Sequence, residues 1–187
     1  MEEEEGLVKG ISFIFFLVLL TPITSSWAAV FKLPMEAVKE VFPEAREVEI
    51  KNIILTPEQV LKIEKISKLK INDRLVSFYL GKKGGDVLGF AVIDTHIVRT
   101  QPETFLLIMD KRGEVKHVEV IAFYEPLEYL LSQKWLNLLI GKGLNDKLRV
   151  KVDLPHVTGA TMSARAIIEA VRKNLAIYQV VFGKDKP

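Results

Sequence analysis

The first thirty residues hold the most apolar part of the chain. Residues 11–20 contain one serine and no charged residue, and threonines, serines and a proline follow them. Ten apolar residues are fewer than the roughly 20 that cross a bilayer as a helix. They match the apolar region of a secretory signal peptide, which is about 7–15 residues long. Ser26 and Ala28 are small residues at the positions that a signal peptidase reads, so we predict that residues 1–28 are cleaved and that the chain is exported.

Two other interpretations of this segment remain open. An uncleaved membrane anchor would run from about residue 11 to residue 31, and a buried core helix is the third alternative. Glu2 to Glu5 precede a single cation, Lys9, although signal peptides usually begin with positive charge. Cleavage and anchoring both place the rest of the chain outside the cytoplasm, in the periplasm or on the extracytoplasmic face of the membrane.

The next forty residues alternate between helical and extended patterns. Residues 34–42 predict a short amphipathic helix with proline in its first turn. Residues 47–55 alternate charged and apolar side chains, which is typical of a half-buried strand. Thr56 as N-cap and Pro57 at the first helical position then predict a second helix that runs to about residue 69.

The middle of the chain predicts two hairpins. Residues 74–80 and 86–98 flank a glycine-rich connection, residues 81–85, which lacks the spacing of a phosphate-binding loop. Residues 104–109 and 114–122 flank a second connection that ends at Gly113. The apolar residues of 114–122 do not alternate, so the sequence leaves the register of that strand open.

From Pro126 the pattern becomes helical. An apolar stripe predicts one helix that ends at Gly141, and a longer stripe predicts a last helix over residues 162–182. No internal repeat is present. The order of elements predicts a single α+β domain, in which helices pack against a mainly antiparallel sheet, preceded by the signal peptide or anchor.

Composition removes several classes of chemistry. The 187-residue chain contains no cysteine, which excludes disulfides, thiol redox chemistry and cysteine-ligated metal centres. His96, His117 and His156 lie too far apart in sequence to form a local metal motif. The net charge of +2 is too small to indicate a nucleic-acid partner.

One short segment carries candidate chemistry. Residues 158–161, Thr-Gly-Ala-Thr, lie between an extended stretch and the start of the last predicted helix. Gly159 allows a tight turn, and the free N–H groups at the start of a helix attract an anion such as phosphate. Thr158, Thr161 and Ser163 add hydroxyl groups. The simpler interpretation of these residues alone is an ordinary helix N-cap.

The segment also resembles the FMN-binding domain family, which includes the flavin-carrying subunits of the Rnf and Nqr membrane electron-transfer complexes. Those proteins carry a Ser/Thr-Gly-Ala-Thr motif followed shortly by Thr or Ser, and this chain reads Thr-Gly-Ala-Thr-Met-Ser at residues 158–163. Residues 125–129 are similar to a Glu-Pro loop of the family, and Trp135 and Gly141-Lys142 also fall at matching places. The resemblance covers roughly residues 74–182. It divides the chain into residues 1–28, an N-terminal part of the domain over 29–73, and an FMN-binding core over 74–187.

The resemblance implies a function and a set of site residues. FMN would be joined through its phosphate to Thr161 by a partner flavin transferase, and the protein would pass electrons between membrane or periplasmic redox partners, as a carrier rather than a stand-alone enzyme. Residues that would contact the cofactor, besides Thr161, are Thr158, Gly159, Ala160, Ser163, Glu125, Leu127, Tyr129, His156 and Arg165. Leu127 and Tyr129 would contact the flavin ring while Glu125 positions their loop. From its place in the loop, His156 would donate to the phosphate or to a flavin oxygen, or else be simply solvated. Arg165 is the first candidate to neutralise the phosphate, before Lys142, Lys147 and Arg149, and a solvated face is the other interpretation of these cations.

One position departs from the family pattern. Family members usually have an aspartate three residues before the motif, where this chain has Pro155, and Asp153 lies two residues earlier. An alternative function therefore stays open, an exported ligand-binding or interaction module with the same fold and no flavin. A hydrolase is disfavoured, because no Gly-x-Ser-x-Gly elbow or triad spacing is present.

Overall fold

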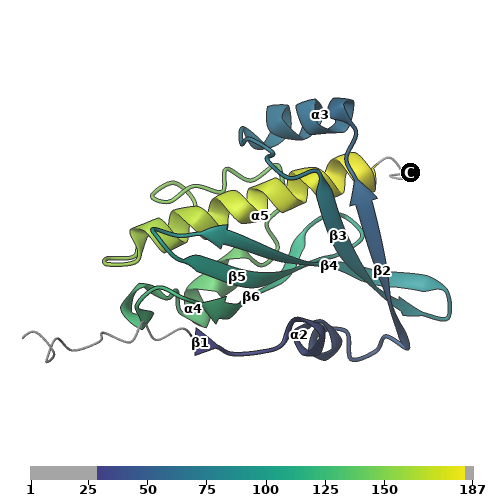
Figure 1. Ribbon diagram of the computed structural model, residues 1–187, viewed down its shortest axis with the longest axis horizontal. Coiled ribbons are helices and arrows are strands. Elements are labelled where there is room, and N and C mark those ends of the chain that lie inside the picture. The colour runs from purple at the N-terminus through teal and green to yellow at the C-terminus, as the bar shows by residue number, and fades with distance from the viewer. Residues whose placement is uncertain (1–28, 184–187) are drawn as a thin grey trace, which may run out of the picture.

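Six antiparallel strands form the sheet, in the order β1-β6-β5-β4-β3-β2 (Figure 1). The computed structural model describes residues 29–183. The strands are β1 (Ala29–Val30), β2 (Glu47–Ile54), β3 (Leu75–Lys83), β4 (Asp86–Ile97), β5 (Pro102–Met109) and β6 (Val115–Phe123). The expected α+β class and antiparallel sheet are confirmed for this part of the chain.

Helices cover both faces of the sheet. The longest helix, α5 (Thr161–Val181), crosses one face, and α2 (Pro34–Val41) packs on the opposite face. Successive strand residues point to opposite faces, so Phe105 and Leu107 of β5 contact α5 while Leu106 lies under α2. Another helix, α3 (Pro57–Ser67), packs on α5.

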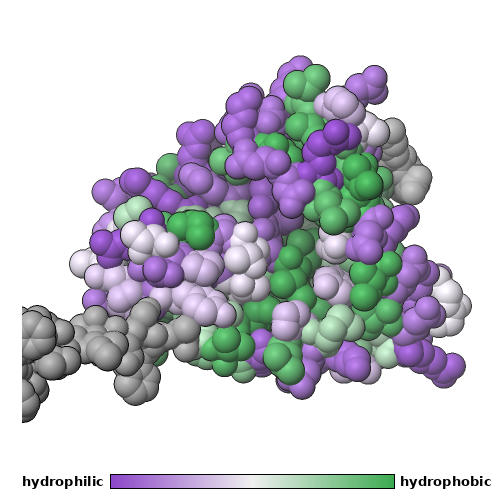
Figure 2. All heavy atoms as spheres, viewed as in Figure 1, coloured by the Kyte–Doolittle hydropathy of each residue, from purple (hydrophilic) through white to green (hydrophobic). Residues whose placement is uncertain are grey.

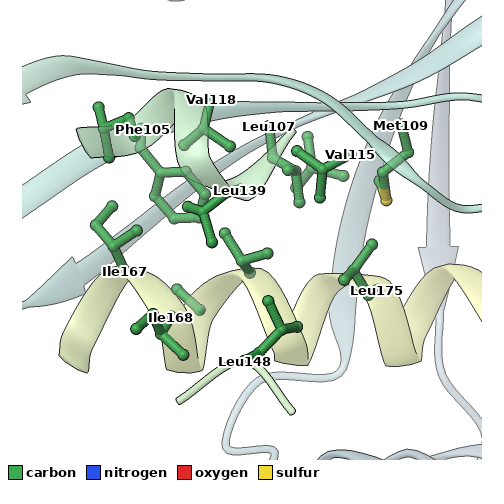
Figure 3. Close-up of a cluster of buried hydrophobic side chains, with 14 of the residues drawn as sticks. Phe105, Leu107, Met109, Val115, Val118, Leu139, Leu148, Ile167, Ile168 and Leu175 are labelled. Atoms are coloured by element: carbon green, nitrogen blue, oxygen red, sulfur yellow. The ribbon is translucent and has the colours of Figure 1, made fainter. Parts of the chain in front are cut away.

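The larger core lies between α5 and the sheet (Figure 3). Phe105 lies above Ile167, and Met109 lies above Leu175, so the start of α5 is next to the start of β5. This pairing places the first turn of α5 at the end of the sheet where β5 begins and β6 ends.

Local sequence signals explain two boundaries. The Thr56 hydroxyl accepts a hydrogen bond from the Gln59 N–H, and the Gln59 side chain accepts one from the Thr56 N–H, so α3 starts with a capping box. The β3–β4 connection is shorter than expected. Lys83 pairs with Asp86, and only Gly84 and Gly85, both at positive φ, form the turn.

The predicted continuous helix from Pro126 to Gly141 is wrong. The chain instead forms a 3-10 turn at Leu127–Tyr129, the short helix α4 (Gln133–Leu136) and a second 3-10 turn at Asn137–Leu139. Leu130 adopts an extended backbone, and Ser132 then caps α4 by accepting from the Trp135 N–H. The apolar periodicity indicates which residues are buried, Leu131, Trp135 and Leu139 among them. It does not indicate an unbroken helix.

The strand β1 was not expected. Ala29 and Val30 pair with Phe123 and Ala122 at one edge of the sheet, so an anchor that reached residue 31 is too long. The signal peptide and the rest of the anchor lie outside the described residues. Among residues 29–183, no helix combines the length and apolar content that spanning a membrane requires.

Candidate functional site

The first turn of α5 has no side-chain cap. Ala160 occupies the N-cap position, and the first turn contains no acidic residue. The first N–H groups of any helix lack partners within the helix, and the dipole of a 21-residue helix adds partial positive charge there. Gly159, at φ +84°, turns the preceding loop into the helix. This end of α5 is therefore open to an anion.

Thr161 is the first residue of α5, and its hydroxyl group is held in place. The Oγ1 donates to the Val157 carbonyl at 3.1 Å and lies 2.8 Å from His156 Nε2. A hydroxyl has one hydrogen, so donation to Val157 leaves the oxygen to accept from the imidazole N–H. The side chain is half-buried, while His156 is exposed.

A cationic cleft of about 470 Å³ adjoins Thr161. Arg149, Lys151, Arg165 and Arg172 line it, with Glu169 as the one acid among its lining residues. Arg172 donates to the Leu148 carbonyl at 2.7 Å, which fixes its guanidinium beside the loop. Such a concentration of one sign of charge in a cleft attracts anions.

Glu125 holds the neighbouring loop. Its Oε1 accepts from the N–H groups of Thr100 at 2.6 Å and Gln101 at 2.9 Å, and the carboxylate is almost fully buried. The Thr100 N–H, followed by the Gln101 N–H, keeps the pKa of Glu125 below its ordinary value although burial opposes this. Glu125 thus ties the start of the loop to the β4–β5 connection.

Exposed apolar and aromatic groups lie next to this loop. Leu127 and Met162 are each 52% exposed. Tyr129 is half-buried under the Arg99 guanidinium, which lies 4.6 Å from its ring centroid. The Ser163 hydroxyl donates to the Tyr129 carbonyl at 2.6 Å, which joins the loop to the first turn of α5.

Two candidate site residues, Ser163 and Lys142, have structural contacts instead of an open position, and Trp135 packs in the core. Ser163 is 1% exposed and its hydroxyl is bonded to Tyr129, so it does not add a free hydroxyl beside Thr161. Trp135 is buried, and its Nε1 donates to the Pro155 carbonyl. Lys142 lies 3.5 Å from Asp153.

Asp153 closes its own loop. Its carboxylate accepts from the N–H groups of Leu148 and Arg149 at 2.9 and 2.7 Å. Burial alone would raise the pKa of Asp153, but the N–H groups of Arg149 and Leu148 lower it below the ordinary value. Both carboxylate oxygens of Asp153 are therefore bonded to backbone N–H groups of its own loop.

The sequence did not single out two cations of the cleft, Lys151 and Arg172. Arg172 follows Arg165 by seven residues, two helical turns along one face of α5, and this spacing was a usable signal. Lys151 adopts a positive φ in a loop, and nothing local in the sequence places it beside Thr161. In the part of the chain that the structure describes, no three acidic or histidine side chains cluster as metal ligands.

Comparisons with known proteins bear on the fold. No protein-family model matches the chain, and no curated protein matches it. A crystal structure of Shewanella oneidensis NqrC superposes with a TM-score of 0.53, covering 78% of this chain and 86% of NqrC. The fold is similar to that of NqrC. The sequence identity to NqrC is 17%, so the likeness establishes the fold alone.

Proposed function

We propose that this protein is an exported electron-transfer flavoprotein that carries FMN through a phosphoester on Thr161. The observation that carries the proposal is the uncapped start of α5, where the Thr161 hydroxyl adjoins a cleft lined by four cations. The NqrC-like fold and the Thr-Gly-Ala-Thr motif of residues 158–161 support it.

The residues present fit a bound phosphate. The N–H groups at the start of α5 and the guanidinium of Arg165 supply donors and positive charge. His156 would keep the Thr161 oxygen oriented toward the cleft, since it lies within hydrogen-bond distance of that atom.

The surroundings also fit an aromatic ring system. Leu127 and Met162 expose apolar surface beside the first turn of α5, and Tyr129 adds an aromatic edge. When bound, the flavin would supply the one- and two-electron chemistry that no side chain of this cysteine-free protein provides. The protein would set the orientation and solvent exposure of the flavin.

The proposal includes a location and partners. Export rests on residues 1–28, and it would place Thr161 outside the cytoplasm together with a flavin transferase and with membrane or periplasmic redox partners.

A second candidate, a ligand-binding or interaction module without flavin, is favoured by one observation. Pro155 stands where the family has an aspartate, and Asp153 is already bonded to its own loop. A transferase that reads an aspartate at that place would not modify this chain.

Intact-mass measurement separates the two candidates. The full chain is co-expressed with a flavin transferase, denatured and weighed. We expect an added mass of FMN less one water in the wild type, loss of that mass in Thr161→Ala and its retention in Ser77→Ala, which removes a hydroxyl on β3 that bonds Asn52. An unmodified wild-type protein would rule out covalent attachment, and modification of Thr161→Ala would place the attachment elsewhere.

A further inference from the structure

The strands β3 and β4 separate halfway along their length. They pair from Lys83 and Asp86 up to Tyr79 and Ala91, and the described pairing stops there. Beyond that point β4 continues to Ile97 paired with β5, and the first residues of β3 pair with β2. Figure 1 shows the two strands running in different directions above this point. The sheet therefore contains a split between its fourth and fifth strands, counted from β1.

The wall of the split formed by β4 carries unpaired backbone groups. In an antiparallel pair, alternate residues turn both N–H and C=O toward the same neighbour. The Val98 N–H bonds the Gln101 carbonyl, so His96 and Asp94 also face β5. Ile93, Thr95 and Ile97 then present their N–H and C=O groups to the split.

The opposite wall is similar. The Arg74 carbonyl accepts from Leu55 of the β2 side, so the alternation turns Leu75 and Ser77 toward the split. The Leu75 N–H is bonded to the Asp73 side chain at 3.0 Å. Among the described residues, the β3–β4 pairing stops at Ala91, and no loop or side-chain hydrogen bond reaches the backbone groups of Ile93 or Thr95 on this side. Such open edges are what a further strand pairs with.

A cleft of about 580 Å³ occupies the split. Its charged floor is already satisfied, because Asp94 lies 2.7 Å from Lys173 Nζ and also accepts from Asn174. Lys70 and Asp73 also line the cleft; Lys70 lies 3.5 Å from Glu64, and Asp73 accepts from the Leu75 N–H. Its exposed apolar side chains are Leu75 and Ile97, 56% and 60% exposed. Residues 92–97 of β4 offer an edge about 20 Å long at the usual rise of a strand.

One of the two sheet faces at the split carries no charged side chain. In the register, the residues of β2 to β4 that share a face with Ile93 include no charged side chain between residues 50–54, 75–79 and 91–97. Its polar groups bond one another, Asn52 with Ser77 and Thr95 with Thr104. Figure 2 shows hydrophobic side chains gathered over β2 and β3, whereas the surface around the start of α5 is mainly hydrophilic.

We propose that this split is a docking site for an extended segment of a partner protein, which adds as a strand to β4. The unpaired N–H and C=O groups of Ile93, Thr95 and Ile97 would supply main-chain hydrogen bonds. The uncharged sheet face beside Ile93 selects a segment with apolar side chains at the alternate positions that lie on that face. The docking site does not depend on a bound flavin.

The remaining segments of this chain are poorer occupants. Residues 184–187 read Lys-Asp-Lys-Pro, which has no alternating apolar side chains for the uncharged face beside Ile93. Residues 1–28 are predicted to be cleaved, and Ala29, where the mature chain would begin, lies in β1 with β6, β5 and β4 between that edge and the split. A partner segment is the occupant that the charge and the topology favour.

Site-specific crosslinking in cells that naturally make the protein tests the proposal. A photoreactive amino acid replaces Ile97 or Leu75 in the full chain, and Leu61 of α3, 67% exposed and outside the cleft, serves as control. We expect one protein adduct from both cleft positions, mapped to a single short segment of the partner, and no such adduct from Leu61. A synthetic peptide of that segment should slow amide exchange at Ile93 and Thr95 about tenfold or more.

Two substitutions of Thr95 test the exposed edge of β4: one blocks it and the other is the control. Thr95→Pro removes the N–H that faces the split and no hydrogen bond to β5, and Thr95→Val removes only the hydroxyl bond to Thr104. Crosslinking from Ile97 should be lost in Thr95→Pro and kept in Thr95→Val, with thermal melting to confirm folding. If Thr95→Pro does not fold, the exchange measurement decides alone. Equal adducts at Leu61, or no adduct at all, would overturn the proposal. Adducts that contain only residues 1–28, a second copy of the chain or lipid would also overturn it. So would amide exchange at Ile93 and Thr95 that the peptide leaves unchanged. Crosslinking in Thr161→Ala as well keeps this result separate from flavin attachment.

Discussion

The two ends of α5 differ in what holds them. At the C-terminal end, Tyr178 and Phe182 pack with Phe90, with ring centroids 4.9 and 4.8 Å apart, and Phe182 also meets Phe78. At the N-terminal end, Thr161 and Ser163 make hydrogen bonds to loops, and the helix has no side-chain cap. Apolar residues of both halves of α5 are buried, Ala164 and Ile167 among them, but an aromatic cluster fixes the C-terminal end while polar contacts join the first turn to its loops.

This difference explains how a stable helix can leave a reactive end open. Unsatisfied N–H groups and clustered cations cost stability, and the packed half of α5 offsets that cost. Function is therefore expected at the uncapped first turn, and substitutions at the two ends should affect different properties.

The largest effect is expected in the aromatic cluster. Phe90 is 7% exposed and touches both Tyr178 and Phe182, so Phe90→Ala should lower the free energy of unfolding by about 3–5 kcal/mol. Leu88→Ala, two residues earlier and 37% exposed, should cost below about 1 kcal/mol. Urea unfolding measures both. Equal losses would show that the aromatic cluster does not anchor α5.

The next comparison uses two glycines outside α5. Gly113 lies beside Tyr178, near the C-terminal end of the helix, and Gly159 lies just before its first residue. Gly113 and Gly159 have φ of +77° and +84°, and a left-handed backbone costs alanine about 1–2 kcal/mol. A Cβ at Gly113 would lie 2.8 Å from the Tyr178 ring, whereas nothing lies within 4 Å of one at Gly159. Gly113→Ala should therefore lose about 1–3 kcal/mol more than Gly159→Ala because of overpacking. Equal losses in urea unfolding would mean that the ring moves aside freely.

The sequence could predict the features of the fold that depend on adjacent residues, but not those that depend on distant contacts. The cap at Thr56 and the double-glycine turn at Gly84-Gly85 are local, so their positions follow from a few adjacent residues. The register of β6 depends on irregularities opposite Thr104 and Ile108 of β5, and no alternation in β6 alone reveals them. The turns of residues 126–141 follow the same rule, because distant partners such as Pro155 and Ser163 fix them.

The candidate site divides in the same way. The sequence places Thr161 at the start of a helix, where the structure has it. The cationic cleft, however, joins residues of α5 to a loop around Lys151, and the Arg99–Tyr129 contact joins residues thirty positions apart. These contacts exist only after the sheet has brought the loops together, so no local pattern predicts them.

The smallest effect is expected at Glu125, on the polar side of the comparison, and it is the one that depends on pH. Glu125→Gln keeps an acceptor for the Thr100 and Gln101 N–H groups but removes the charge, so at pH 7 it should lower the free energy of unfolding by about 1 kcal/mol. The pKa of Glu125 is lowered in the folded protein. The unfolded chain therefore binds the proton first, and the carboxylate stabilises fully above the unfolded pKa of about 4.3 and less as pH falls through the lower folded value.

The difference between wild type and Glu125→Gln should accordingly shrink below about pH 4, whereas the loss in Phe90→Ala should not change with pH, because no charge is altered there. Urea unfolding of the three proteins at pH 7 and at about pH 3.5 measures both trends. A Glu125→Gln loss that is the same at the two pH values would mean that shape rather than charge holds the loop. The loop beside the first turn of α5 would then be held by packing, as the C-terminal end of the helix is, and not by charge.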